Sequence, residues 1–120
     1  MALSPRLLVH EVARPTQAPS EADLQRAVID LARMFGWRIA HFRPAHTAKG
    51  WRTPVEADGK GWPDLVMIRP PRIVIAELKV GRNQVTEDQA TWLELFRQAN
   101  LETHVWRETD LRGSILDTLR

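Results

Sequence analysis

The sequence predicts one α/β domain with the element order αβββαβα. Three observations predict it. A chain of 120 residues can bury one hydrophobic core but not two. Three segments carry apolar residues at helical spacing, and four short apolar or alternating runs between them are typical of strands. We expect residues 20–120 to form the domain and residues 1–19, which have three prolines and no sustained period, to form a flexible N-terminal arm.

The first helix and strand have clear boundary signals. Ser20 is a helix N-cap, and the acidic first turn that follows suits the helix dipole. The spacing predicts a helix over residues 21–35 that ends at Gly36. The alternating run "WRIAHF" predicts a strand over residues 37–42. Residues 44–61 then form a long polar loop, which in a small domain is often functional.

The second half begins with a β-hairpin. Its predicted strands are residues 64–68 and 72–79, joined through "RPPR". "TEDQATWLELFRQAN" predicts a second helix, in which Thr86 and Gln89 have the spacing of a capping box. A fourth strand over residues 102–106 and a closing helix over residues 109–119 complete the order.

Composition excludes several classes of protein. The chain has no cysteine, so disulfides, thiolate nucleophiles and cysteine-ligated zinc are excluded. No apolar run approaches the roughly 20 residues of a membrane-spanning helix, and no secretory signal opens the chain, so we expect a cytoplasmic location. The formal net charge of +2 alone is weak evidence for a polyanionic partner.

The hairpin carries charges in an apolar context. If Arg69 pairs with Arg72, Asp64 lies directly opposite Glu77, and Lys79 shares a face with Glu77 because strand side chains alternate. Two opposed carboxylates repel each other unless a divalent cation lies between them. "RPPR" is not a favoured two-residue turn, so a slip of register would separate the pair.

Oxygen ligands of this kind suit Mg²⁺ or Mn²⁺. Lys79 would then lie near the metal and could orient or deprotonate an attacking water. The alternative is a structural salt bridge between Lys79 and one carboxylate, which leaves the other carboxylate unexplained.

Each helix offers one further candidate from its first turn. Glu21 lies within the apolar stripe of the first helix, either as a terminal residue favoured by the dipole or as a third inward acid. Gln89 projects from the second helix, where the capping box is a sufficient explanation for it.

The long loop is rich in basic residues that could contact a phosphate backbone. Trp51 and Trp62 could stack on exposed bases, and the alternative is an ordinary solvated loop. His41 and His46 lack a clearly spaced third ligand for zinc, so we assign them to DNA contact or solvent exposure. The candidate nucleic-acid-binding residues are Arg43, His46, Lys49, Arg52 and Lys60.

The motif formed by Pro63-Asp64 and, thirteen residues on, Glu77-Leu78-Lys79 resembles the PD-(D/E)XK nuclease signature. "GWPDL", "ELK" and "TEDQATWL" together resemble the VRR-Nuc group, the virus-type replication and repair nucleases, over about residues 20–118. The single-domain phage and bacterial members are the closest match.

The resemblance implies a restriction-endonuclease-like αβββαβ core, a mixed sheet flanked by helices, with a C-terminal helix added. It implies a Mg²⁺-dependent endonuclease, with Mn²⁺ able to substitute, that acts on branched DNA such as Holliday junctions as a homodimer, in a bacterial or phage-infected host cell. Asp64, Glu77 and the Leu78 carbonyl would bind the metal, with Lys79, Glu21 and Gln89 as catalytic residues. A non-cleaving nucleic-acid-binding module on the same fold is the alternative function, and a zinc hydrolase built on the four histidines is a third.

Overall fold

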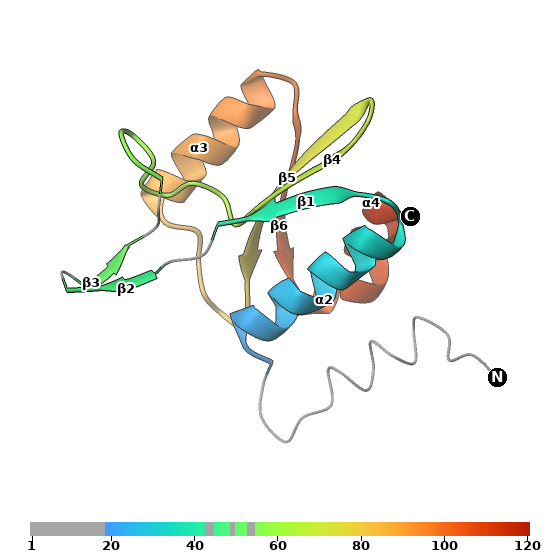
Figure 1. Cartoon of the computed structure of the whole chain (residues 1–120), viewed down its shortest axis with the longest axis horizontal. Helices are drawn as coiled ribbons and strands as arrows, with labels where there is room; N and C mark the ends of the chain where they lie inside the picture. Colours follow the sequence, from blue (N-terminus) through green and yellow to red (C-terminus); the bar gives the residue numbers. More distant parts are fainter. Residues whose placement is uncertain (1–18, 43–44, 49, 53–54) are drawn as a thin grey trace.

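The computed structural model describes residues 19–42, 45–48, 50–52 and 55–120 (Figure 1). The arm predicted over residues 1–19 therefore lies outside the described residues, apart from Pro19. The elements in chain order are α2 (Glu21–Met34), β1 (Arg38–His41), β2 (Ala45–Thr47), β3 (Gly50–Arg52), β4 (Leu65–Arg69), β5 (Arg72–Lys79), α3 (Glu87–Gln98), β6 (Glu102–Arg107), a 3₁₀ turn (Glu108–Asp110), a π-helical segment (Leu111–Ile115) and α4 (Leu116–Leu119).

The main sheet has four strands in the order β1-β4-β5-β6. The β1–β4 and β4–β5 pairs are antiparallel, whereas β5 and β6 are parallel, so the sheet is mixed. Helix α2 and the C-terminal helical segment bury their apolar residues against one face of this sheet, and α3 lies on the other side (Figure 1). The predicted α/β class, mixed sheet and C-terminal helix are thus confirmed.

Both long helices start as the sequence predicts. The Ser20 side chain accepts a hydrogen bond from Asp23, whose carboxylate accepts one from the Ser20 N–H in return. Thr86 and Gln89 form the same reciprocal box at α3. These bonds satisfy backbone groups that have no partner inside a helix. In the described part of the chain, no helix has both the length and the apolar content to cross a bilayer.

Two predicted elements differ from the structure. The long polar loop over residues 44–61 contains a small antiparallel hairpin, in which β2 pairs with β3. Such a hairpin has too few residues for alternation to reveal it. The closing helix is helical over its predicted length but changes from 3₁₀ to π to α winding. Gly113, a poor helix former, lies in the π-helical segment.

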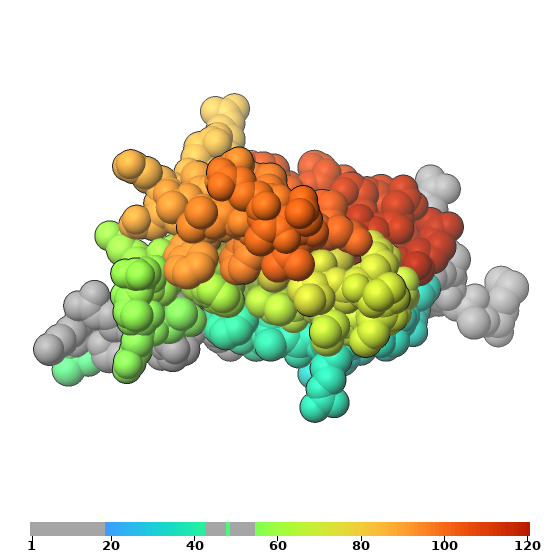
Figure 2. Space-filling view, turned by 90° about the horizontal axis from the view of Figure 1, so that it is seen from above, coloured from blue at the N-terminus to red at the C-terminus, as the bar shows by residue number. Residues whose placement is uncertain are grey.

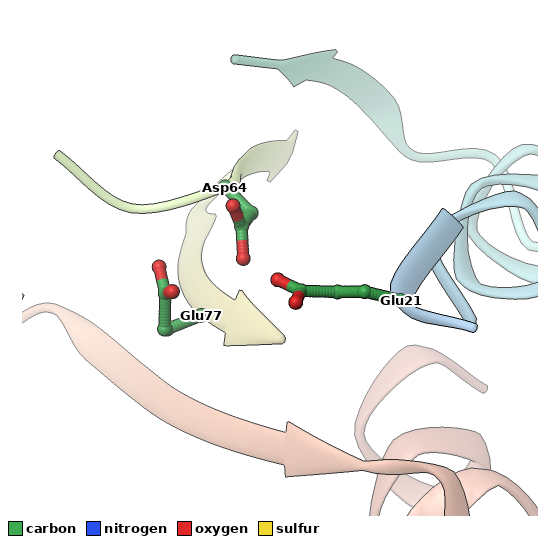
Figure 3. A group of neighbouring side chains, drawn as sticks. All are labelled: Glu21, Asp64 and Glu77. Carbon is green, nitrogen blue, oxygen red and sulfur yellow. The ribbon is translucent and has the colours of Figure 1, made fainter. Parts of the chain in front are cut away.

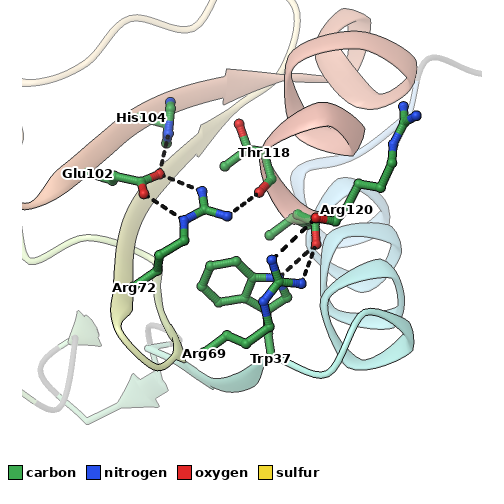
Figure 4. A network of polar contacts seen from close by, with 8 residues as sticks. Trp37, Arg69, Arg72, Glu102, His104, Thr118 and Arg120 are labelled. Atoms are coloured by element: carbon green, nitrogen blue, oxygen red, sulfur yellow. Dashed lines mark hydrogen bonds and ion pairs between the residues drawn. The ribbon is translucent and has the colours of Figure 1, made fainter.

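The turn of the β4–β5 hairpin is fastened to the end of the chain (Figure 4). Two guanidinium groups lie close to the Trp37 ring, that of Arg69 at 4.6 Å and that of Arg72 at 5.0 Å from its centre. Arg69 donates to the carbonyls of Phe35 and Leu119, and Arg72 donates to the carbonyl of Thr118. Arg72 also binds both carboxylate oxygens of Glu102 on β6 at 2.8 Å. We call Trp37, Arg69, Arg72 and Glu102 the arginine clamp.

Candidate metal centre

Three carboxylates from separate segments meet at one point (Figure 3). Glu21, Asp64 and Glu77 each offer an oxygen atom, and the three atoms lie within 4.8 Å of one another. Among the described residues, this is the group whose spacing suits a metal ion. It contains no histidine, so it does not correspond to a histidine-based zinc site.

The hairpin register brings Asp64 and Glu77 together. Leu65 pairs with Ala76 and Arg69 with Arg72, as the sequence predicts, so Asp64 lies one step beyond the ladder, opposite Glu77. The Asp64 carboxylate accepts a hydrogen bond of 2.8 Å from the Leu78 N–H, and its backbone carbonyl accepts one from Phe42. These bonds fix Asp64 although it lies outside β4.

Helix α2 supplies the third acid. Glu21 is the first residue of the helix after the Ser20 cap, so its position follows from where the helix starts. Both explanations that the sequence allows for Glu21 hold. It is an acidic first-turn residue at the positive end of the helix dipole. It is also part of the carboxylate cluster.

Crowding and burial raise the pKa values of these acids. Burial, together with the charge of Asp64, raises the pKa of Glu77 to about 8. Burial also raises the pKa of Asp64, against the lowering effect of its hydrogen bond from Leu78, and burial raises the pKa of Glu21. The cause is general, since an ion loses its hydration in the interior and like charges at short range repel. Without a cation, the site is therefore partly protonated near neutral pH.

Lys79 offsets part of this charge. Its ammonium nitrogen lies 3.5 Å from a Glu77 oxygen, and both side chains are buried, with relative exposures of 10% and 1%. The structural salt bridge considered from the sequence is therefore present. One lysine faces three carboxyl groups, however, so it can balance only one of the three negative charges that full ionisation would produce.

The residues fit a hard divalent cation. Neither carboxylate oxygen of Glu77 accepts a hydrogen bond from an N–H or O–H of the described residues. Glu77 can form a side-chain hydrogen bond with Asp64, in which the two carboxyl groups share a proton. Buried charged oxygens without donors are costly unless a metal binds them. An all-oxygen set is also what Mg²⁺ and Mn²⁺ prefer.

The segment before Asp64 is held against α3 by close packing (Figure 2). Gly61 has a φ of +85°, and a Cβ there would lie 2.5 Å from the Asp88 backbone, so glycine is required. Trp62 then packs edge-on against Trp92 and Phe96, with ring centres 4.9 and 5.4 Å away. The pattern "GKGW" is the sequence signal for this contact, which the sequence reasoning missed.

Gln89 and Leu78 are two further residues that the sequence predicts for the site. The Gln89 amide oxygen accepts a hydrogen bond from the Thr86 N–H, so the capping role is real, and a catalytic role stays a prediction. The Leu78 N–H points to Asp64, and its carbonyl lies on the same side because a strand residue directs both groups to one neighbour. Binding of a metal by that carbonyl also stays a prediction.

The basic loop is only partly described. Arg43 and Lys49 lie outside the described residues. His46 and Arg52 belong to the β2–β3 hairpin, but their side chains also lie outside the described part. Lys60 is exposed and pairs with Asp88 at 3.4 Å. DNA contact by these five residues remains a prediction.

His41 is a second basic residue, besides Lys79, whose charge acts on the acids. It ends β1, pairs with Leu65 and is exposed, and its charge acts on Asp64 to lower the Asp64 pKa.

Comparison with known proteins adds no assignment: no protein-family model matches the chain, and no curated protein sequence matches it significantly.

Proposed function

We propose that the protein is a metal-dependent DNA endonuclease of the VRR-Nuc group of PD-(D/E)XK nucleases. The observation that carries the proposal is the convergence of Glu21, Asp64 and Glu77 within 4.8 Å, with Lys79 beside them. Three carboxylates with a lysine beside them are the groups that metal-assisted phosphodiester hydrolysis needs. The mixed four-stranded sheet is compatible with the restriction-endonuclease-like core that we propose for it.

Each residue has a role that follows from its position. The carboxylates of Glu21, Asp64 and Glu77 would hold Mg²⁺, or Mn²⁺ in its place. An ion held there would act as a Lewis acid toward the phosphate and would lower the pKa of a water ligand. Lys79 Nζ, held by Glu77 at 3.5 Å, orients the attacking water through its N–H groups. The rigid hairpin keeps these groups in place, as a reaction controlled by geometry requires.

We infer branched DNA as the substrate and a homodimer as the active form. Both follow from the likeness of "GWPDL", "ELK" and "TEDQATWL" to VRR-Nuc sequences. Symmetric cutting of a four-way junction needs two sites related by a two-fold axis. A mass measurement in solution tests the dimer, and a role in replication, recombination or repair would follow from junction cleavage.

The decisive experiment is cleavage of an end-labelled four-way junction, with a flap and a plain duplex in parallel reactions. The purified chain should cut the junction with Mg²⁺ or Mn²⁺ and not with EDTA. Asp64→Asn and Lys79→Ala should each lower the rate at least about a hundredfold, the usual effect of losing one acid–base or charge-stabilising group. Glu94→Gln, which changes an exposed carboxylate on α3, is the matched control and should cut normally.

The alternatives give different results. Junction binding without cleavage in either metal would favour the non-cleaving module. Zinc bound stoichiometrically to the purified protein would favour the histidine-based hydrolase. Full activity of Asp64→Asn would remove the proposed mechanism even if the chain cuts DNA.

A further inference from the structure

A groove runs between α2 and the edge strand β1. It consists of two open hollows of about 290 and 580 Å³ that share Arg33. Partly buried Ile29 and Ile39 contribute apolar walls. We call these two hollows the α2–β1 groove; the residues that line them are Ala22, Gln25, Arg26, Ile29, Asp30, Arg33, Gly36, Trp37, Arg38, Ile39 and His41.

One end of the groove is lined by residues next to the metal centre, although none of the three acids lines it. Ala22 lines it and follows Glu21 directly in the chain. His41 lines it from the other side, and Phe42, the next residue, donates its N–H to the Asp64 carbonyl. The groove therefore starts beside two of the three proposed metal ligands and leads away along α2.

The charge in the groove is largely positive. Arg26, Arg33 and Arg38 line it with His41, and Asp30 is the only acid among the described residues that line it. Arg26 has Asp23 as an ion-pair partner at 3.8 Å. Arg33 and Arg38 are exposed, and neither forms an ion pair with another described residue. By contrast, Arg69 and Arg72 are held by carbonyls and a carboxylate.

The geometry points to the α2–β1 groove as the track for the phosphate backbone of one DNA strand that leaves the metal centre. Arg33 and Arg38 would contact phosphates, because unpaired arginines offer several N–H donors to phosphate oxygens. The inference rests on the proposed function for its choice of ligand. It assigns a binding surface distinct from the five nucleic-acid-binding residues that the sequence predicts.

The groove has the length for several nucleotides. From Ala22 to Arg33 the helix rises about 16 Å, at 1.5 Å for each residue. A B-form strand advances 3.4 Å for each nucleotide, so the groove covers about five steps. Contacts at its far end are therefore remote from the cut and should affect binding more than chemistry.

The test measures binding of a fluorescent four-way junction in EDTA, where metal-dependent cutting cannot proceed, at several salt concentrations. Arg33→Ala and Arg38→Ala should each lower the slope of log K against log salt by about 0.7–0.9. At 0.1 M salt this corresponds to binding about five- to eightfold weaker for each arginine. Asp30→Asn should tighten binding about two- to threefold, the effect of removing one like charge about 7 Å away in water. A gain in affinity cannot come from misfolding.

Matched controls lie on α3. Arg97 is the basic residue in the last turn of α3, as Arg33 is in α2, and Glu94 is an exposed acid there. Arg97→Ala and Glu94→Gln should leave the affinity unchanged. The groove assignment is overturned if Arg33→Ala and Arg38→Ala bind like Arg97→Ala, or if Asp30→Asn does not tighten binding.

The two proposals fail separately. If the chain cuts no DNA with either metal but both arginine variants lose binding, the groove assignment stands and the proposed nuclease activity is wrong. If the chain cuts junctions but both arginine variants bind DNA normally, the nuclease activity stands and the groove assignment is wrong. Competition by poly-glutamate as strong as that by unlabelled DNA would overturn the assignment to nucleic acid.

Discussion

Lowering the pH from 8.5 to 6.5 should weaken Mg²⁺ binding about 25-fold, because a proton and the metal compete for Glu77. Burial and the charge of Asp64 raise the Glu77 pKa to about 8. A metal ligand must be deprotonated, so apparent affinity scales with the deprotonated fraction of Glu77. For a pKa of about 8, that fraction falls about 25-fold across this range. Glu21 and Asp64, whose pKa values are also raised, can only steepen the dependence.

Calorimetric titration measures both the affinity and the number of protons released. Repeating the titration at pH 7 in buffers with different ionisation enthalpies counts released protons, and about 0.9 should leave for each ion bound by a group with a pKa of about 8. Glu94→Gln should reproduce the parent values, whereas Glu77→Gln should lose binding. Equal affinity at both pH values, with no proton released, would refute the competition between proton and metal at Glu77.

Two further predictions concern stability. Between pH 4.5 and 8, the folded metal-free chain keeps a proton on Glu77 that the unfolded chain has lost, so its free energy of unfolding should fall by about 1.4 kcal/mol for each rising pH unit. Urea unfolding in EDTA at several pH values measures this slope, and Glu77→Gln should flatten it. An unchanged slope in that variant would show that a group other than Glu77 takes up the proton. Thr86→Ala should cost about 1 kcal/mol, because the α3 cap loses its bond to the Gln89 N–H. Thr91→Ala, on the same helix, is the control. If both variants lose the same free energy of unfolding, the loss does not come from the helix cap.

The sequence predicts those parts of the site that depend on local rules. The hairpin register follows from alternation and from a short connection, and it is confirmed from Leu65 to Arg69. Both helix starts follow from side chains that bond to nearby backbone groups. The pairing of Asp64 with Glu77 therefore follows from sequence alone.

Contacts between distant segments could not be predicted in the same way. Whether Glu21 joins the acids depends on how α2 crosses the sheet, and its position in an apolar stripe allows two outcomes. The α2–β1 groove brings Arg33 of a helix beside Arg38 of a strand, and neither residue has a sequence pattern that signals a groove. The β2–β3 hairpin is short enough that its alternation is indistinguishable from loop sequence.

The arginine clamp has a consequence for how mutations in this protein are interpreted. A slip of one residue between β4 and β5 would turn each side chain of the slipped strand to the opposite face, and Asp64 would no longer oppose Glu77. Arg69 and Arg72 oppose such a slip, although Arg69 lies about 16 Å from Asp64 along β4. Substitutions in the clamp would loosen this register and are expected to weaken metal binding, although they remove no ligand. In an activity screen, Arg72 would resemble a catalytic residue, although its bonds are made to Glu102 and Thr118.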